Sequence, residues 1–443
     1  MRVRLTSLLL LSSALLAQQP PPIIFQHATI IDGTGRVRKD ASLHIDGARI
    51  AGISLPLVRG AGTIDCRMKF IIPGLINAHG HLGITKGAGS GPENYTPENV
   101  AAQLDQYARF GVTTVLSLGL NRDLVYDLRD KPPGAVSTES PGATIFTAGR
   151  GIGVPNGAPP LNVASDQVYR PSTPEEARAA VREMAGHHPD IVKIWVDDIR
   201  GTMPKMQPEV YRAVVEEAHS NHLRVAAHIY YAADAAALVD LGVEVIAHSV
   251  RDKDVDPTLV RAMKEKGVIY IPTLELDDSF FLYADHPELL KDPFLAGALN
   301  PDLRAMLASR EWRDKVKNDP ATPKNRAAFD MALRNLRAMH AGGVQIAMGT
   351  DSGATPLRLQ GFAEHLEMEL MKRAGLSAMD VLVSATRSGA AVCGVTDRGT
   401  LEAGKVADFI VLNEDPLQDI RNTREIWQVW HNGQPVTRGE ASK

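Results

Sequence analysis

Two histidines one residue apart, His79 and His81, are the residues of this sequence whose spacing points most directly to chemistry. They follow the apolar run Phe70-Ile71-Ile72 by a few residues. In an extended strand, side chains at i and i+2 point to the same face. Both imidazoles would therefore project from one strand end and could hold a divalent metal ion together. Taken alone, the pair is also compatible with two polar residues in a loop.

Further residues of ligand type lie at or near the ends of four other apolar segments. A lone histidine can be a satisfied core residue, and an aspartate before Ser-Gly can be a turn residue. A lysine inside an apolar strand is costly to bury in its charged form, although it could extend its amine outward. A neutral amine could react with carbon dioxide and give a carbamate that bridges two metal ions. Occurring together at strand ends, the residues predict a metal site: Lys193, His228, His248 and Asp351.

The segments that would position these residues alternate between strand and helix. Eight strands alternating with helices predict an α/β fold, a (β/α)8 TIM-type barrel, in which active sites form at the carboxyl ends of the strands. Residues 277–342 are longer than a simple connection, and we expect a helical insertion that could cap the barrel mouth. The strand candidates are 70–76, 112–118, 144–148, 191–196, 224–229, 243–247, 268–274 and 344–348.

The two flanks of this region have a different pattern. Residues 23–69 contain short alternating strands separated by Asp-Gly steps, which favour tight turns, and residues 395–438 are similar. Neither flank is large enough to be stable alone. We therefore predict one small composite β-sandwich built from 23–69 and 395–438, beside a metal-dependent hydrolase barrel at 70–394.

The first residues are typical of a targeting segment. Arg2 and Arg4 precede a short apolar stretch that ends at Ala17 before a polar break, which predicts a signal peptide over 1–17. The stretch is too short to be a comfortable membrane anchor, although a buried first helix or an uncleaved anchor are alternatives. We therefore expect an exported protein, periplasmic or secreted, with no stable membrane anchor.

Charge and cysteine content exclude several other classes of function. A net charge of −4 without a long basic run argues against nucleic acid as a partner, so we expect a small-molecule substrate and leave a homo-oligomer open. Only Cys66 and Cys393 are present; they could pair in an exported protein, but they are too few for a thiolate-rich metal site.

We expect the remaining polar candidates on the surface, either on charged helical faces or beside them: His219, His222, His340, His365, Glu364, Glu367 and Glu369.

With these motifs the chain resembles the amidohydrolase superfamily of metal-dependent hydrolases, and more narrowly its imidazolonepropionase and prolidase-like (Xaa-Pro dipeptidase-like) branch. The resemblance implies a (β/α)8 barrel with a composite β-sandwich. The chain departs from the prolidase-like pattern at 154–158, where a Gly-Gly-His is usual, and at Ser249, where glycine is usual. The segments that carry the resemblance are 73–81, 267–274, 349–353, 369–376 and 399–412.

The resemblance also implies roles for the candidate residues. One metal ion would be held by His79, His81 and Asp351, the second by His228 and His248, and a carboxylated Lys193 would bridge them. Zinc is the default among ions that accept nitrogen and oxygen ligands, although manganese, cobalt or iron could occupy such a site. A hydroxide shared by the two ions would attack the substrate carbonyl, and Asp351 would carry its proton to the leaving amine.

Two further residues are predicted to bind substrate. Tyr230 lies two residues after His228 and would reach the barrel rim, where it could equally be an ordinary rim aromatic. Arg150 closes the third predicted strand and could meet an anionic group, or could form a structural salt bridge instead.

The sequence therefore predicts a metal-dependent amidohydrolase that cleaves a C–N amide bond, with peptide-like or N-acyl amino acid substrates as the first expectation. Cyclic amides or lactones are the alternative substrates. A non-hydrolytic metal-binding protein, and a lyase or decarboxylase on the same scaffold, also remain open at this point.

Overall fold

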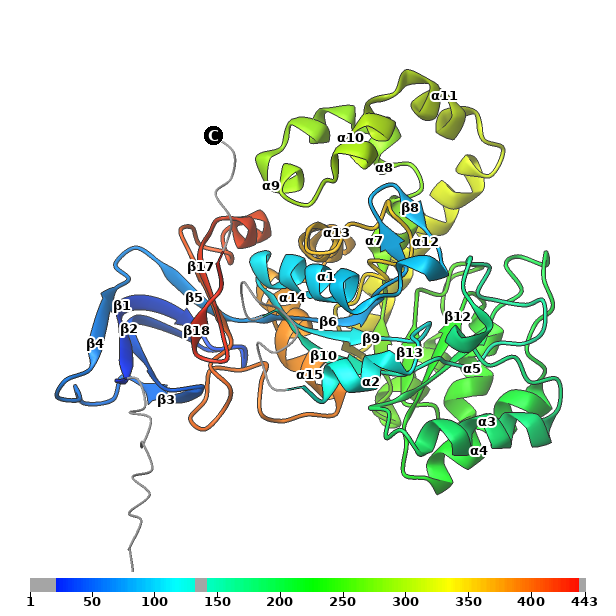
Figure 1. Ribbon diagram of the computed structural model, residues 1–443, viewed down its shortest axis with the longest axis horizontal. Helices are drawn as coiled ribbons and strands as arrows, with labels where there is room; N and C mark the ends of the chain where they lie inside the picture. The colour runs from blue at the N-terminus through cyan, green and yellow to red at the C-terminus, as the bar shows by residue number, and fades with distance from the viewer. Residues whose placement is uncertain (1–20, 132–141, 438–443) are drawn as a thin grey trace, which may run out of the picture.

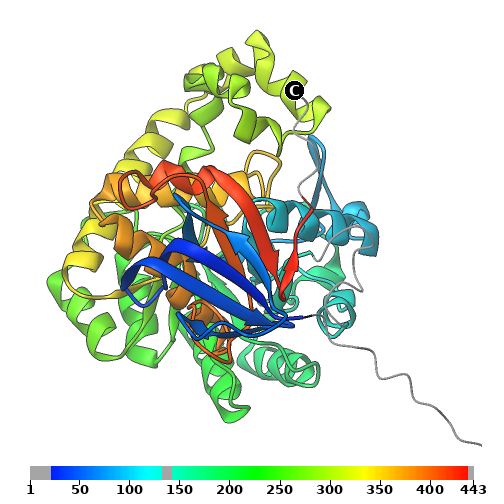
Figure 2. The same ribbon diagram turned by 90° about the vertical axis from the view of Figure 1, so that its left-hand side faces the viewer.

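Strands from both ends of the chain share one eight-stranded sheet in a computed structural model, which describes residues 21–131 and 142–437 (Figure 1). The predicted signal peptide at 1–17 lies outside the described residues. Figure 2 shows the early strands, in blue, beside the late strands, in orange to red. The order is β18(Gln434–Pro435), β17(Ile426–His431), β16(Phe409–Leu412), β5(Phe70–Pro73), β1(Ile23–Ile31), β2(Val37–Asp46) and β3(Arg49–Ile53), with β4(Gly62–Asp65) also paired to β1.

Aromatic contacts join the two chain ends in the core of this sheet. The ring of Phe25 in β1 meets Phe409 of β16 edge-on at 4.9 Å and Trp430 of β17 at 5.0 Å between centroids. All three rings are buried, so each end supplies apolar area that the other needs.

Eight further strands of the described residues form two parallel sheets. Backbone hydrogen bonds connect the two sheets on both sides: Ile152 N–H donates to the Lys193 carbonyl at 2.8 Å, and Ala78 N–H donates to the Met348 carbonyl at 3.0 Å. The first sheet has the order β10(Thr144–Thr147), β9(Val112–Ser117), β6(Leu75–Gly80). The second has the order β11(Val192–Val196), β12(Val225–Ile229), β13(Val245–Ala247), β14(Ile269–Ile271), β15(Gln345–Ile346).

The strand predicted over 70–76 is in fact two strands. Residues 70–73 form β5 and pair antiparallel with β16, whereas residues 75–80 form β6 and pair parallel with β9. Gly74 separates them, and a Cβ at this position would lie 2.2 Å from Oγ1 of Thr113. A residue with a side chain would not fit where the chain passes from one sheet to the other.

Helices connect the parallel strands and begin at well-formed caps. Thr96, Thr173 and Asp256 each accept a backbone N–H at the start of α1, α3 and α6, as helix N-termini require. The helices between and after the strands are α1(Pro97–Arg109), α2(Leu124–Arg129), α3(Pro174–Ala185), α4(Pro208–Ser220), α5(Ala232–Leu241), α6(Pro257–Glu265), α13(Phe362–Ala374), α14(Ala378–Val383) and α15(Gly389–Cys393).

The segment between β14 and β15 is helical, in agreement with the predicted insertion. Helices α9 to α11 lie apart from the strands at the top of Figure 1. The long helix α12 then leads back to β15. The helices of this segment are α7(Leu274–Asp278), α8(Leu282–Asp285), α9(Pro293–Ala296), α10(Pro301–Ala308), α11(Arg310–Asn318) and α12(Thr322–Ala341).

The two cysteines are free thiols in the structure, and both are buried. Burial raises the pKa of Cys66 to about 11 and that of Cys393 to about 12, so both stay protonated at neutral pH. In the part of the chain that the structure describes, no helix is both long and apolar enough to cross a bilayer.

Candidate active site

His79 and His81 converge on a single carboxylate. His79 belongs to β6 and His81 follows it directly, while Asp351 lies in the segment after β15. The Nε2 atoms of His79 and His81 are 3.2 Å and 2.9 Å from the same Oδ1 of Asp351. All three side chains are buried, and one potential ligand atom from each lies within 4.8 Å of the others. This trio could hold one divalent ion.

His228 and His248 extend the cluster. Their ring centroids are 4.2 Å apart, and the His248 ring is 4.7 Å from that of His79. Each ring has one nitrogen engaged by a neighbouring oxygen: Nε2 of His228 by Oδ2 of Asp197 at 2.9 Å, and Nδ1 of His248 by Oγ1 of Thr273 at 2.8 Å. In both rings the other nitrogen has no hydrogen-bond partner among the described residues, so it could bind a metal ion.

Lys193 projects from β11 with its amine fully buried. Its Nζ has no hydrogen-bond partner within the described ranges, and the Trp195 ring centroid lies 5.5 Å away. Burial lowers the pKa of Lys193 to about 7, against the opposing effect of Asp351. A large fraction of this amine is therefore neutral, and nucleophilic, near neutral pH.

An arginine that the motifs did not reveal holds Asp351 in its ionised form. Burial alone would raise the pKa of Asp351, but the Arg358 guanidinium and hydrogen bonds from His79 and His81 hold it well below its usual range. Nη1 of Arg358 contacts Oδ2 of Asp351 directly. The Asp351 backbone has φ of 62°, in the left-handed region, which is uncommon for residues other than glycine, although aspartate adopts it more readily than most.

A buried glutamate fixes the two segments that carry the His-His-Asp trio. Oε1 of Glu364 in α13 accepts hydrogen bonds from Asn77 of β6 and from Thr350 and Ser352, each at 2.7 Å. Oε2 accepts the Gly361 N–H at 2.7 Å. One carboxylate thus joins β6 to the segment that contains Asp351.

The prediction of surface positions is therefore wrong for three residues of α13. Glu364, His365 and Glu367 are all fully buried, because α13 packs against neighbours on several sides and exposes charged side chains only near its C-terminal end, at Lys372 and Arg373. His365 bonds to the Phe110 carbonyl and to Thr423, and Glu367 accepts the N–H groups of Leu274 and Glu275 at the start of α7.

The cluster opens into a cavity of about 480 Å³, a volume suited to a small ligand. Its polar lining includes His81, His228, His248, Asp351 and Tyr230. A second part of the wall is apolar and includes residues of the helical insertion: Leu120, Pro159, Pro160, Leu161, Trp195, Ile199, Leu276, Phe280, Ala321 and Ala328.

Comparison with known proteins identifies the family. Residues 70–436 match the sequence profile of the Amidohydrolase family, which is most of the chain. The chain belongs to the amidohydrolase family. It is thus an enzyme of the hydrolase class, and members of this family generally bind divalent metal ions.

Relatives of this amidohydrolase span nearly its whole length. Ochratoxinase from Aspergillus niger is 26% identical over 454 residues, which cover 91% of this chain and 84% of the fungal one. A solved Xaa-Pro dipeptidase has the same fold, with a TM-score of 0.74 at 23% identity, over 94% of this chain and 99% of the other. A putative prolidase from Bifidobacterium longum gives 0.73 at 25% identity, over 95% of each chain.

The two predicted substrate-binding residues of this amidohydrolase have different surroundings. Tyr230 lines the cavity, and the Arg251 guanidinium lies 4.9 Å from its ring centroid. Arg150 is not among the residues that line the cavity. Its Nη2 and Nε contact the Asp123 carboxylate at 2.5 Å and 3.0 Å, and Tyr169 stacks near its guanidinium. These contacts favour the alternative of a structural salt bridge for Arg150.

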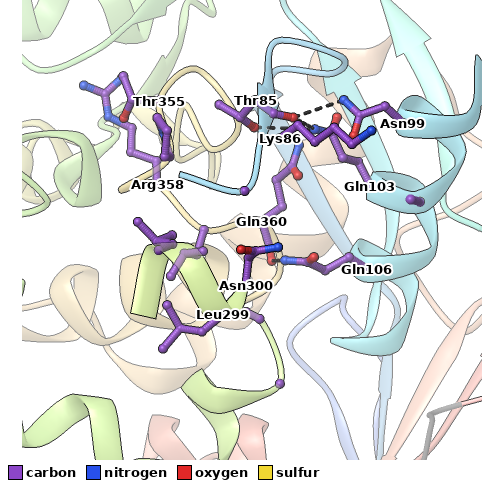
Figure 3. Close-up of a pocket in the computed structure, with 17 residues that line it drawn as sticks. Thr85, Lys86, Asn99, Gln103, Gln106, Leu299, Asn300, Thr355, Arg358 and Gln360 are labelled. Carbon is purple, nitrogen blue, oxygen red and sulfur yellow. Dashed lines mark hydrogen bonds between the residues drawn. The ribbon is translucent and has the colours of Figure 1, made fainter. Parts of the chain in front are cut away.

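Figure 3 shows a second cavity, of about 310 Å³. Arg358 lines this cavity as well as the first. Its wall is rich in carboxamides that are already engaged in hydrogen bonds. Gln103 and Asn99 donate to the Thr85 carbonyl at 2.8 Å and 3.0 Å, and Gln106 donates to that of Gln360 at 2.7 Å. These bonds fasten the segment after His81 and the segment after Asp351 to helix α1.

Proposed function

We propose that this amidohydrolase hydrolyses a C–N amide bond with the help of two divalent metal ions, zinc by default. His79, His81 and Asp351 would hold one ion, and His228 and His248 the second, with a carboxylated Lys193 between them. When bound, such ions polarise a substrate carbonyl and lower the pKa of a water molecule.

The buried amine of Lys193 is the observation that carries this proposal. An amine without a hydrogen-bond partner in a fully buried position is costly unless something else satisfies it. Carboxylation removes the positive charge of the amine and places carbamate oxygens, which can bind metal ions, beside the imidazoles. The orphaned Nζ and the unengaged ring nitrogens of His228 and His248 fit a pair of cations.

The chain's own residues supply the proton transfer. Because its pKa lies well below the usual range, Asp351 is ionised at neutral pH and can accept a proton from the attacking water. It can then deliver this proton to the leaving amine. Arg358 holds the Asp351 side chain in place during both steps and favours the return of the carboxylate to its ionised form.

We also infer the larger architecture from the strand pairings. The two parallel sheets, connected by backbone hydrogen bonds on both sides, support one (β/α)8 barrel over 70–394. The shared eight-stranded sheet supports the composite β-sandwich of 23–69 and 395–438.

From the sequence alone, we propose that 1–17 is a cleaved signal peptide; N-terminal sequencing of the exported protein tests it.

The cavity favours substrates with an apolar group beside the amide, such as N-acyl amino acids or dipeptides. Its wall combines a large apolar surface with a few polar groups near the cluster. Relatives named Xaa-Pro dipeptidase and ochratoxinase support an amide bond as the target.

The direct test is hydrolysis of a panel of N-acyl amino acids, dipeptides and lactones by the metal-loaded protein, with metal content measured by elemental analysis. We expect amides to be cleaved, and Asp351→Asn to lower kcat by about 100- to 10,000-fold while much of the metal is retained. Absence of turnover on every amide would contradict the proposed reaction. An unchanged rate in Asp351→Asn would remove the proton-transfer role of this residue.

A further inference from the structure

Three arginines line the main cavity, and they differ in what already neutralises them. Arg251 forms an ion pair with Asp277 at 3.0 Å, and Arg358 forms one with Asp351. Arg200 forms no ion pair with any described residue. Its Nη2 donates instead to the neutral amide oxygen of Asn325 in α12, at 2.9 Å. Arg200 is therefore the cavity arginine whose charge is not compensated by the protein.

The backbone that presents Arg200 is strained. Ile199 and Arg200 both have positive φ, 50° and 59°, a region that is unfavourable for L-residues and most of all for a β-branched one. Two carboxylates hold this conformation. Oδ1 of Asp197 accepts the Ile199 N–H at 2.9 Å, and Oδ1 of Asp198 accepts the Gly201 N–H at 2.8 Å. Strain of this kind persists where the surroundings enforce it, often at ligand-binding positions.

Strand β11 connects Arg200 to the candidate metal cluster. Lys193 lies within β11, and the loop that contains Arg200 follows β11 directly. Asp197 in this loop also bonds to His228, which fixes the loop beside the cluster, and the bond from Arg200 to Asn325 fixes it beside α12. Arg200 and the histidine cluster line one continuous cavity.

None of the other charged groups that line the cavity forms an ion pair with Arg200. Asp197 is engaged by His228, and Asp277 and Asp351 have their own arginines. The remaining carboxylate is Asp319. It forms no ion pair with Arg200 or with another described residue, and its Oδ1 accepts the Ala321 N–H at 2.7 Å.

We propose that Arg200 binds a free carboxylate on the substrate, so that the enzyme selects amides that carry a carboxylate group over uncharged ones. The inference rests on the proposed amide hydrolysis and names the substrate feature that it recognises. A guanidinium can meet a carboxylate through two parallel hydrogen bonds, which gives both affinity and orientation. The apolar remainder of the substrate would lie against the wall that includes Trp195 and Phe280.

The test compares an N-acyl amino acid that has an apolar side chain with its carboxamide, in which an uncharged group of similar size replaces the carboxylate. We expect the metal-loaded enzyme to prefer the acid, by kcat/KM, about 10- to 100-fold. In Arg200→Met this ratio falls towards one, mainly because KM for the acid rises. Arg200→Lys retains part of the preference, since it keeps the charge but loses the paired hydrogen bonds.

Arg310→Met is the matched control. Arg310 is exposed in α11, faces Asp314 and is outside the cavity lining, so its removal changes the net charge equally and the ratio should stay at the wild-type value. If Arg200→Met keeps the wild-type ratio, or Arg310→Met loses it as well, the role of Arg200 is refuted while amide hydrolysis stands. If the wild-type enzyme cleaves neither these compounds nor any other amide, both proposals fail.

Discussion

The imidazoles of His228 and His248 are each oriented by one oxygen from a neighbouring segment. For His228 this oxygen belongs to Asp197, which is buried and ionised: although burial opposes ionisation, the contact with His228 lowers the pKa of Asp197 to about 2. A charged acceptor on one ring nitrogen fixes the tautomer and makes the other nitrogen a better metal ligand. Asp197 is thus a positioning residue beside the proposed second ion.

Asp197→Asn should weaken metal binding about 10- to 100-fold, because the amide is a poorer acceptor for the His228 N–H. Titration calorimetry of the metal-free protein with zinc measures the affinity and the stoichiometry. We expect the loss to be confined to one of the two ions.

Asp198→Asn provides the comparison for this measurement. Asp198 is the next residue in the same loop and bonds to Gly201 and Tyr231, but it does not contact a candidate ligand. Equal losses of affinity in the two variants would show that the loop as a whole, and not the contact with His228, is responsible.

Helix α13 links β6 to the segment after β15 through the side chain of Glu364. Four donors converge on this carboxylate, and two of them, Thr350 and Ser352, flank Asp351 directly. The position of Asp351 relative to His79 therefore depends on a helix that contributes no ligand itself.

Glu364→Gln should lower the free energy of unfolding by about 1–3 kcal/mol, because the amide nitrogen would face at least one N–H or O–H donor. Chemical denaturation measures the change. Glu369→Gln, on a half-buried position of the same helix that contacts Arg424, should cost less. A Glu364 variant as stable as the wild type would show that this carboxylate does not hold the two segments together.

Sequence patterns predicted the strands well where one hydrophobic periodicity dominates. They failed where a segment passes from one sheet to another, or where distant parts of the chain cover a helix. The strand candidates after residue 76 all correspond to strands, since apolar runs bounded by helices leave few alternatives. Residues 70–76 looked like one strand because the break at Gly74 depends on Thr113, which is distant in sequence. Glu364 and His365 were assigned to the surface because a helical pattern does not reveal which neighbours will cover it.

The same distinction explains which residues of the candidate site could be predicted from the sequence. The histidines of the cluster and Asp351 were found because strand ends converge in an α/β fold with parallel sheets. Arg358, Asp197 and Arg200 were missed, since they lie on loops whose path is set by tertiary contacts such as the bond from Arg200 to Asn325.

For the molecule as a whole, buried carboxylates make stability depend on pH. Asp278 in α7 is buried, and burial raises its pKa from 3.8 to about 6, with Arg373 and His286 opposing the effect. Well below pH 4 this carboxyl is protonated in both the folded and unfolded states. As the pH rises towards 6 the unfolded state ionises first, so the stabilising contribution of the protonated group is lost over this range and then stays constant.

Asp278→Asn should therefore be more stable than the wild type above pH 6, by about 3 kcal/mol, and equal to it near pH 4. Denaturation at a series of pH values measures the difference between the two proteins, which cancels the contributions of other groups. A difference that does not change between pH 4 and 6 would contradict the pKa assigned to Asp278.

The pairing of β16 with β5 on one side and β17 on the other has a consequence for biosynthesis. A ribosome delivers β5 more than three hundred residues before β16, so the edge of β5 stays without its partner until the last strands have emerged. Shorter nascent chains expose a strand edge able to pair with other chains, a common origin of aggregation. The shared sheet is thus completed only after β16 and β17 have been synthesised, and a chain that terminates before β16 exposes the edge of β5 and is prone to aggregation.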